Sequence, residues 1–130
     1  VWGPETQRES PEDAVVREVM EEAGCRISVS GLLGVYLWIH PQTRQQFLRI
    51  VYTADLVTEN QRQKLDNGIY AVHWYSVADI KHRKRDCRSP VVLRSIDDYL
   101  AGKRQPPTLL AGIMPVQKNV SAVLAHACLV

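Results

Sequence analysis

Residues 3–25 of this chain read GPETQRESPEDAVVREVMEEAGC, and their spacing predicts one well-delimited helix. Ser10 suits the N-cap, because its hydroxyl can accept a hydrogen bond from a free amide of the first turn. Pro11 then takes the first helical position, where no backbone donor is needed. Gly24 ends the helix, since glycine readily adopts the left-handed conformation that closes many helices.

The two sides of this helix differ in chemistry, because at about 100° per residue apolar and charged side chains separate. The apolar side holds Val15, Val16, Val19, Met20 and Ala23. The charged side holds Arg17, Glu18, Glu21 and Glu22. The helix is therefore amphipathic, with a carboxylate stripe facing away from the core.

This stripe predicts a metal site. Carboxylates spaced i, i+3 and i+4 repel one another by roughly a few tenths of a kcal/mol per pair on an exposed helix. A hard divalent cation removes that repulsion, because Mg²⁺ and Mn²⁺ prefer oxygen ligands. We predict that Glu18, Glu21 and Glu22 bind such an ion; the alternative is an ordinary solvated helix face. Arg17, one turn before Glu21, can orient it, and Glu9 can tie the preceding loop to Arg17.

Seven residues of this stretch form a fixed pattern, namely Gly3, Glu9, Arg17, Glu18, Glu21, Glu22 and Gly24. The pattern resembles the Nudix box, the signature of hydrolases that cut diphosphates linked to another group. The resemblance implies a Nudix pyrophosphohydrolase or phosphatase that uses Mg²⁺ or Mn²⁺. Its partner would be a small diphosphate, such as a nucleoside di- or triphosphate or a related pyrophosphate.

After the helix, β-branched and aromatic residues predict several strands. The expected extended segments are 26–30, 35–39, 47–56 and 70–75. A turn is expected at the two glycines of 31–34, and a break at 40–43, so that the second and third segments form an antiparallel pair. The segment 58–68 is polar.

Two helical segments are expected further on. A short turn should cover 76–80, and a longer helix should open at Ser89 and Pro90 and run to Gly102. The apolar stripe of the longer helix is Val92, Leu93, Ile96, Tyr99 and Leu100. Strands with helices before and after predict an α/β fold, an α/β/α sandwich around a mixed β-sheet.

Four later segments strengthen the resemblance, namely Trp38-Ile39, 47–56, Trp74-Tyr75-Ser76 and Arg88-Ser89-Pro90. They are similar to the small bacterial Nudix phosphatase branch, whose members act on nucleoside di- and triphosphates and on thiamin-pathway pyrophosphates. The likeness covers roughly residues 3–110.

The implied reaction is attack of water on phosphorus, which asks a protein mainly for positioning and charge neutralisation. One carboxylate must take the proton of the water. Glu21 is the first candidate for this base and Asp66 the second, with Arg17 in support. Arg49 is a candidate to balance phosphate charge; its alternative is a surface arginine.

Substrate selection is expected outside the box. Tyr36, Trp38 and His40 alternate along one strand face and can stack on a base or pyrimidine ring. The alternatives are that Tyr36 and Trp38 belong to the core and that His40 caps the turn before Pro41.

Length and composition predict a single domain over residues 1–130. The apolar fraction is 45%, the charged fraction 23% and the net charge +2. We do not expect nucleic acid to be the partner, and an RNA-decapping role rests only on the basic run 81–85. Three scattered cysteines show no zinc or disulfide spacing, which favours a reducing cytoplasm. No apolar run approaches the roughly 18 residues needed to span a membrane.

The sequence departs from the family at three places. The chain opens two residues before the box, where the family has strands; we hypothesise that 120–130, within the tail 114–130, takes the first-strand position through permutation or reordering. The alternative is a carboxy-terminal helix or strand docked on the domain. Residues 4–8 lack the usual glycine ahead of Glu9, and Asp66 stands where relatives often carry a glutamate base.

These departures keep a rival function open. A catalytically inactive Nudix-like module that binds a ligand or regulates a partner would tolerate an altered box loop. A missing edge strand also makes a homodimer one candidate arrangement, because an unpaired sheet edge can pair with a second chain.

Overall fold

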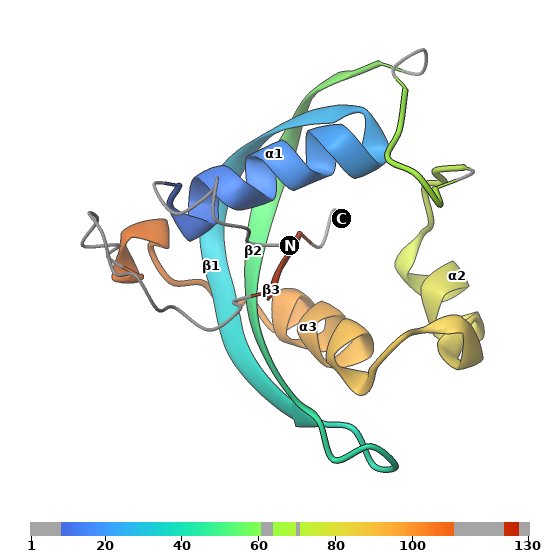
Figure 1. The fold of residues 1–130 in the computed structure, drawn as a ribbon. Helices are drawn as coiled ribbons and strands as arrows, with labels where there is room; N and C mark the ends of the chain where they lie inside the picture. Colours follow the sequence, from blue (N-terminus) through green and yellow to red (C-terminus); the bar gives the residue numbers. More distant parts are fainter. Residues whose placement is uncertain (1–8, 61–63, 70, 111–123, 128–130) are drawn as a thin grey trace.

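The computed structural model describes residues 9–60, 64–69, 71–110 and 124–127 (Figure 1). The helices are α1 (Pro11–Ala23), α2 (Val77–His82) and α3 (Pro90–Leu100), with 3₁₀ turns η2 (Lys84–Asp86) and η3 (Pro107–Leu109). The strands are β1 (Cys25–Ile39), β2 (Gln46–Glu59) and β3 (Leu124–Ala127). β2 lies between its neighbours, antiparallel to β1 and parallel to β3, so the sheet is mixed as predicted.

Helix α1 begins and ends as its sequence predicts. The Ser10 hydroxyl accepts a hydrogen bond of 3.1 Å from the Asp13 amide, and Gly24 adopts φ 66°. Its inner side packs on one face of the sheet, against a buried cluster that includes Ile50 and Tyr52 of β2. The remaining buried members of that cluster are Val15, Val19, Cys25, Ile27 and Leu32.

Helix α3 covers the opposite face. Val91 of α3 packs with Leu33 and Val51, and Tyr36, Trp38 and Tyr99 border this second cluster. Successive β2 residues point to opposite faces, so Ile50 meets α1 whereas Val51 meets α3. The result is the predicted α/β/α sandwich, with α1 and α3 packed on opposite faces of the sheet.

The turn expected at 31–34 is wrong, because β1 runs unbroken through it. The glycines are needed for space instead. A Cβ on Gly31 would lie 3.1 Å from Thr53 Oγ1, and a Cβ on Gly34 would lie 2.9 Å from the Tyr36 ring. The pairing with β2 shifts register near both glycines, which is how a strand absorbs small residues as bulges.

The strand expected at 70–75 is also wrong for its described part. Residues 71–76 have no regular secondary structure and are exposed; Tyr70 lies outside the described residues. Their side chains turn toward the end of α1 instead of joining a ladder, and Trp74 Nε1 donates a 3.2 Å hydrogen bond to Glu59. β2 also extends through Thr58 and Glu59, which were expected in a polar loop.

Both later helices form, but the stripe of α3 is rotated. Leu100 is exposed, whereas Ser95 and Asp98 are buried beside Val91 and Ile96. Polar residues can occupy these positions because Asp98 is hydrogen bonded to three side chains and Ser95 Oγ donates to the Val92 carbonyl. The short helix α2 starts at Ser76, whose Oγ accepts from the Asp79 amide.

The described part of the tail is a strand rather than a helix. β3 pairs in parallel with residues 49–52 of β2. Whether it replaces the first strand of the family stays a prediction, as does the single-domain organisation, because the rest of 114–130 lies outside the described residues. Gly3 and residues 4–8 lie outside them too. Within the described part of the chain, none of the helices is long and apolar enough to cross a membrane.

Candidate functional site

Arg17 links the loop ahead of α1 to the carboxylate stripe. Its Nε donates to both carboxylate oxygens of Glu9, at 3.0 and 3.1 Å, and its Nη1 donates to Glu21 Oε2 at 3.0 Å. The hydrogen bond to Glu9 is the main cause that raises the pKa of Arg17. Both contacts expected from the sequence are therefore present, and the Glu21 carboxylate is fixed on one side.

A second acidic group gathers at the carboxyl end of α1. The Asp66 amide donates to the Glu21 carbonyl at 3.1 Å, which holds the loop carrying Asp66 against the helix end. Partial loss of solvation, then the negative charges of Glu18 and Asp66, raise the pKa of Glu22. The charges of Glu18 and Asp66 thus both act on Glu22, although Asp66 comes from a different segment.

The donor chemistry of this region fits a hard divalent cation, because carboxylates that repel one another are stabilised by such an ion. The arrangement differs from a ready three-carboxylate cage. Glu21 is turned to Arg17, and among the described residues no three histidine, cysteine, aspartate or glutamate side chains gather closely enough to hold an ion.

Arg49 is buried, contrary to the surface alternative. Only 8% of the residue is exposed, its Nε has no hydrogen-bond partner, and its guanidinium lies 6.0 Å from the Phe47 ring centre. Burial, and then the like charge of Arg88, lower the pKa of Arg49. The Arg88 charge also acts on Glu22, so Arg88 stands within electrostatic reach of both the buried arginine and the acidic helix end.

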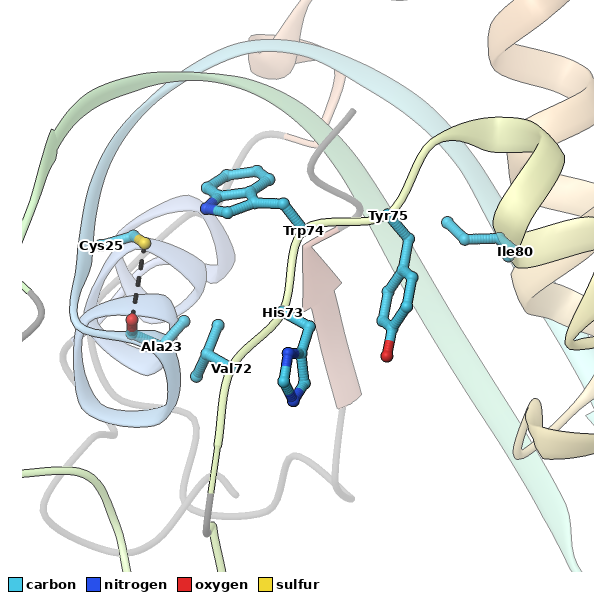
Figure 2. Close-up of a pocket in the computed structure, with 7 residues that line it drawn as sticks. All are labelled: Ala23, Cys25, Val72, His73, Trp74, Tyr75 and Ile80. Atoms are coloured by element: carbon cyan, nitrogen blue, oxygen red, sulfur yellow. Dashed lines mark hydrogen bonds between the residues drawn. The ribbon is translucent and has the colours of Figure 1, made fainter.

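An open cavity of about 110 Å³ lies at the carboxyl end of α1 (Figure 2). Its aromatic lining comes from His73, Trp74 and Tyr75, which the sequence reasoning assigned to a strand. The complete lining is Ala23, Cys25, Val72, His73, Trp74, Tyr75 and Ile80. An aromatic wall in a cavity that also includes Ala23, the residue after Glu22, is suited to a flat ring. The run of aromatic residues was the available signal, but it also matched strand composition.

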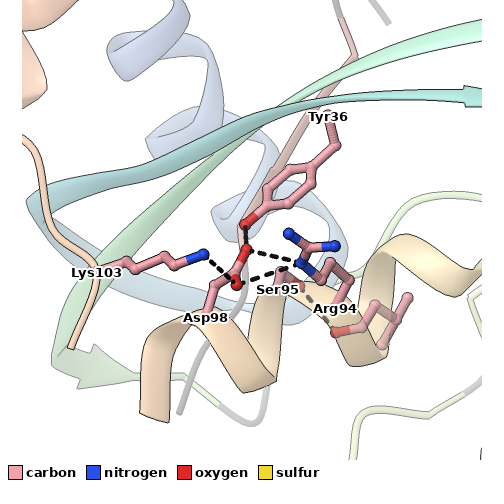
Figure 3. Close-up of polar contacts among 6 residues, drawn as sticks. Tyr36, Arg94, Ser95, Asp98 and Lys103 are labelled. Carbon is pink, nitrogen blue, oxygen red and sulfur yellow. Dashed lines mark hydrogen bonds and ion pairs between the residues drawn. The ribbon is translucent and has the colours of Figure 1, made fainter. Parts of the chain in front are cut away.

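Tyr36 has a structural role in the fold. Its hydroxyl donates a 2.7 Å hydrogen bond to Asp98, which also accepts from Arg94 and Lys103 (Figure 3). The contacts of Trp38 are aromatic, at 5.3 Å from the His40 ring and 5.5 Å from the Phe47 ring.

His40 shapes the hairpin turn. Its Nδ1 accepts from the backbone amides of Gln42 and Thr43, at 3.2 Å each. These contacts match the packing and capping alternatives, and a stacking role for Tyr36, Trp38 and His40 on the substrate stays a prediction.

The basic run 81–85 makes contacts within the chain. Lys81 pairs with Asp97 at 3.3 Å, and Arg83 with Asp86 at 3.8 Å. Arg83 also lies 5.0 Å from the centre of the Tyr75 ring. These contacts favour a solvated surface segment over a nucleic-acid site.

Two residues whose side chains can bind a ligand were not predicted as site residues. Arg88 and Ser89 were noted only as the opening of a helix. Ser89 is 4% exposed, and its Oγ neither caps α3 nor has another hydrogen-bond partner. An arginine directly before a Ser-Pro helix start was the available signal, because such a start leaves backbone amides free.

Comparison with known proteins agrees with this arrangement. The sequence model described as NUDIX domain matches residues 3–94. "Phosphatase NudJ" of Escherichia coli (strain K12) is 31% identical over 109 residues, which are 83% of this chain and 70% of that protein. "Putative nudix hydrolase 1" of Caenorhabditis elegans is 29% identical over 123 residues, and this chain spans only 32% of its length.

A solved structure shares the fold. The NUDIX hydrolase from Nitrosomonas europaea superposes with a TM-score of 0.77 and 34% identity, over 84% of this chain and 72% of that one. The family match covers well over half of the chain and includes every residue of the acidic helix. The chain therefore belongs to the Nudix hydrolase family.

Proposed function

We propose that this protein hydrolyses a small molecule containing a diphosphate, such as a nucleoside di- or triphosphate or a related pyrophosphate. The observation that carries the proposal is the link from Glu9 through Arg17 to Glu21, beside the mutually repelling carboxylates of Glu18 and Glu22. Supporting it, the bacterial relative with 31% identity is described as a phosphatase.

Glu18 and Glu22 are the proposed ligands of Mg²⁺ or Mn²⁺. When bound, such an ion neutralises phosphate oxygens and lowers the pKa of a coordinated water. The chain itself positions the base. Arg17 binds Oε2 of Glu21 and leaves Oε1 to accept a proton from the attacking water. Asp66 is the second candidate for this base, because the Glu21 carbonyl holds its loop close by.

The test measures phosphate or pyrophosphate release from nucleoside di- and triphosphates, dinucleoside polyphosphates, sugar nucleotides and thiamin-type pyrophosphates. Each substrate is incubated with Mg²⁺ and with EDTA. We expect turnover of one class with metal only, and a loss of about 10²- to 10⁴-fold in kcat for Glu21→Gln, the usual range for a general base.

Asp13→Asn is the matched control, because Asp13 is an exposed acid in the first turn of the same helix, two turns before Glu21. It should leave kcat unchanged. Hydrolysis that persists in EDTA, or equal activity in Glu21→Gln, contradicts the mechanism. A folded protein that turns over none of the substrates but binds one of them would instead be the ligand-binding module.

A further inference from the structure

The buried arginine of β2 and the start of α3 meet on one face of the sheet. Arg49 and Val51 are two residues apart on β2, so their side chains share a face. Val51 packs against Val91 in the first turn of α3, two residues after Ser89. The amino end of α3 therefore lies over the β2 segment that carries Arg49.

The other end of α3 is fixed to the same face. Tyr36 is the cross-strand partner of Arg49, and its hydroxyl donates a hydrogen bond to Asp98 in the last turn of the helix. α3 consequently covers this segment of the sheet at both of its ends, which accounts for the burial of Arg49.

Two polar groups in this place are buried without partners. Among the residues that the structure describes, Arg49 Nε and Ser89 Oγ have no hydrogen-bond partner, although the two residues are only 8% and 4% exposed. Within the described residues no carboxylate pairs with the Arg49 guanidinium. A buried cation with neither a counter-charge nor a full set of hydrogen bonds is costly, and a second cation nearby adds to the cost.

The nearby second cation is Arg88, which precedes Ser89 and is exposed. Together with burial, which is the larger cause, its like charge lowers the pKa of Arg49. The free amides at the amino end of α3 add further positive potential. One bound oxyanion would satisfy the guanidinium of Arg49, the Ser89 hydroxyl and the Arg88 charge together.

We infer that Arg49, Arg88 and Ser89 form a phosphate-binding site, which holds a phosphate of the substrate. This inference rests on the proposed function for the identity of the ligand. It assigns phosphate binding to the α3 side of β2, where two arginines supply the positive charge.

The experiment measures binding of inorganic pyrophosphate in EDTA by isothermal titration calorimetry, so that metal and catalysis play no part. We expect the unaltered chain to bind pyrophosphate and Arg88→Gln to bind it about ten- to a hundredfold more weakly, the usual effect of losing a hydrogen bond between charged groups. Arg85→Gln removes the same charge from an exposed arginine three residues earlier and should bind as the unaltered chain does.

A second variant tests the buried partner. Arg49→Lys keeps the charge but loses the planar fork that matches a phosphate, and we expect weaker binding with an unchanged circular dichroism spectrum. If Arg49→Lys fails to fold, the comparison of pyrophosphate binding by Arg88→Gln and Arg85→Gln tests the site by itself. With substrate and Mg²⁺, Arg88→Gln should raise KM and leave kcat nearly constant, a split that a purely structural role would not produce.

The outcomes separate the two proposals. The phosphate site is overturned if the chain does not bind pyrophosphate in EDTA, or if Arg88→Gln and Arg85→Gln weaken pyrophosphate binding equally. Either result overturns it even where Mg²⁺-dependent hydrolysis is found. Specific pyrophosphate binding without any hydrolysis supports the site and refutes only the catalytic proposal.

Discussion

Asp98 offers a quantitative test of how α3 is held on the sheet. Its side chain accepts hydrogen bonds from Tyr36 at 2.7 Å, Lys103 at 3.0 Å and Arg94 at 3.3 Å (Figure 3). These donors, Tyr36 first, lower the pKa of Asp98 from 3.8 to about 2. A group with a lowered pKa stabilises the folded state above its unfolded pKa and loses that contribution as the pH falls through its folded pKa.

The size of the effect follows from this pKa difference. One pKa unit corresponds to about 1.36 kcal/mol, so the ionised carboxylate contributes at most about 2.4 kcal/mol to the free energy of unfolding at pH 7. The side chains of Arg94 and Lys103 are 65% and 56% exposed, so solvent screens part of their charge. We therefore expect Asp98→Asn to cost about 1–2 kcal/mol at pH 7.

The assay is urea unfolding of both proteins between pH 7 and pH 3. By linkage, about half of the difference should be lost at pH 3, where the unfolded aspartate is already mostly protonated. Asp97→Asn is the control, because the Asp97 side chain is 59% exposed and forms an exposed ion pair with Lys81. A difference below about 0.5 kcal/mol at pH 7, or one that does not shrink toward pH 3, would refute the role given to these hydrogen bonds.

Two further changes test α1. Gly24→Ala should lower the free energy of unfolding, measured in urea, by about 1–2 kcal/mol, because Gly24 has φ 66° and a Cβ is strained there. An unchanged midpoint of urea unfolding would show that the chain can end α1 in another way. Arg17→Lys should lower kcat at least about tenfold while changing stability by less than about 1 kcal/mol, because a lysine cannot contact Glu9 and Glu21 with one planar group; equal kcat would show that the orientation of Glu21 does not limit catalysis.

Local sequence signals were sufficient for α1 and for the hairpin. The Ser10 cap and the Gly24 stop each depend on a contact within one turn of the helix. Ser10 accepts from the Asp13 amide, and the Gly24 amide donates to the Met20 carbonyl. The same holds for the break at 40–43, where His40 caps its own turn. The contacts of Arg17 were predictable for the same reason, since helical spacing places Glu21 beside it.

Signals that depend on distant residues misled the sequence reasoning. Gly31 and Gly34 look like a turn, but they leave room for Thr53 and the Tyr36 ring. The first of these neighbours is on another strand, so the reason for the glycine is invisible in the local sequence. The proposed phosphate site is also invisible in the local sequence. Arg49 and Ser89 are 40 positions apart in the chain, and they come to the same face of the sheet only because α3 packs on Val51.

The segment 49–52 of β2 shows what this packing requires. Ile50 and Tyr52 fill the core under α1, and Val51 fills the core under α3, so three of its four residues are apolar or aromatic and fully enclosed. The fourth, Arg49, pairs with Tyr36 on one side and Leu124 on the other. An aliphatic residue there would satisfy the fold at no electrostatic cost.

A charged residue that weakens a core position is expected where function requires it. Arg49 is such a residue, because its burial comes without a carboxylate partner among the described residues and with Arg88 as a like-charged neighbour. The cost of that burial is recovered when an anion binds. In the proposed mechanism the chemistry is divided by β2, with proton and metal chemistry on the carboxylates of α1 and phosphate recognition on Arg49 and Arg88 at the start of α3.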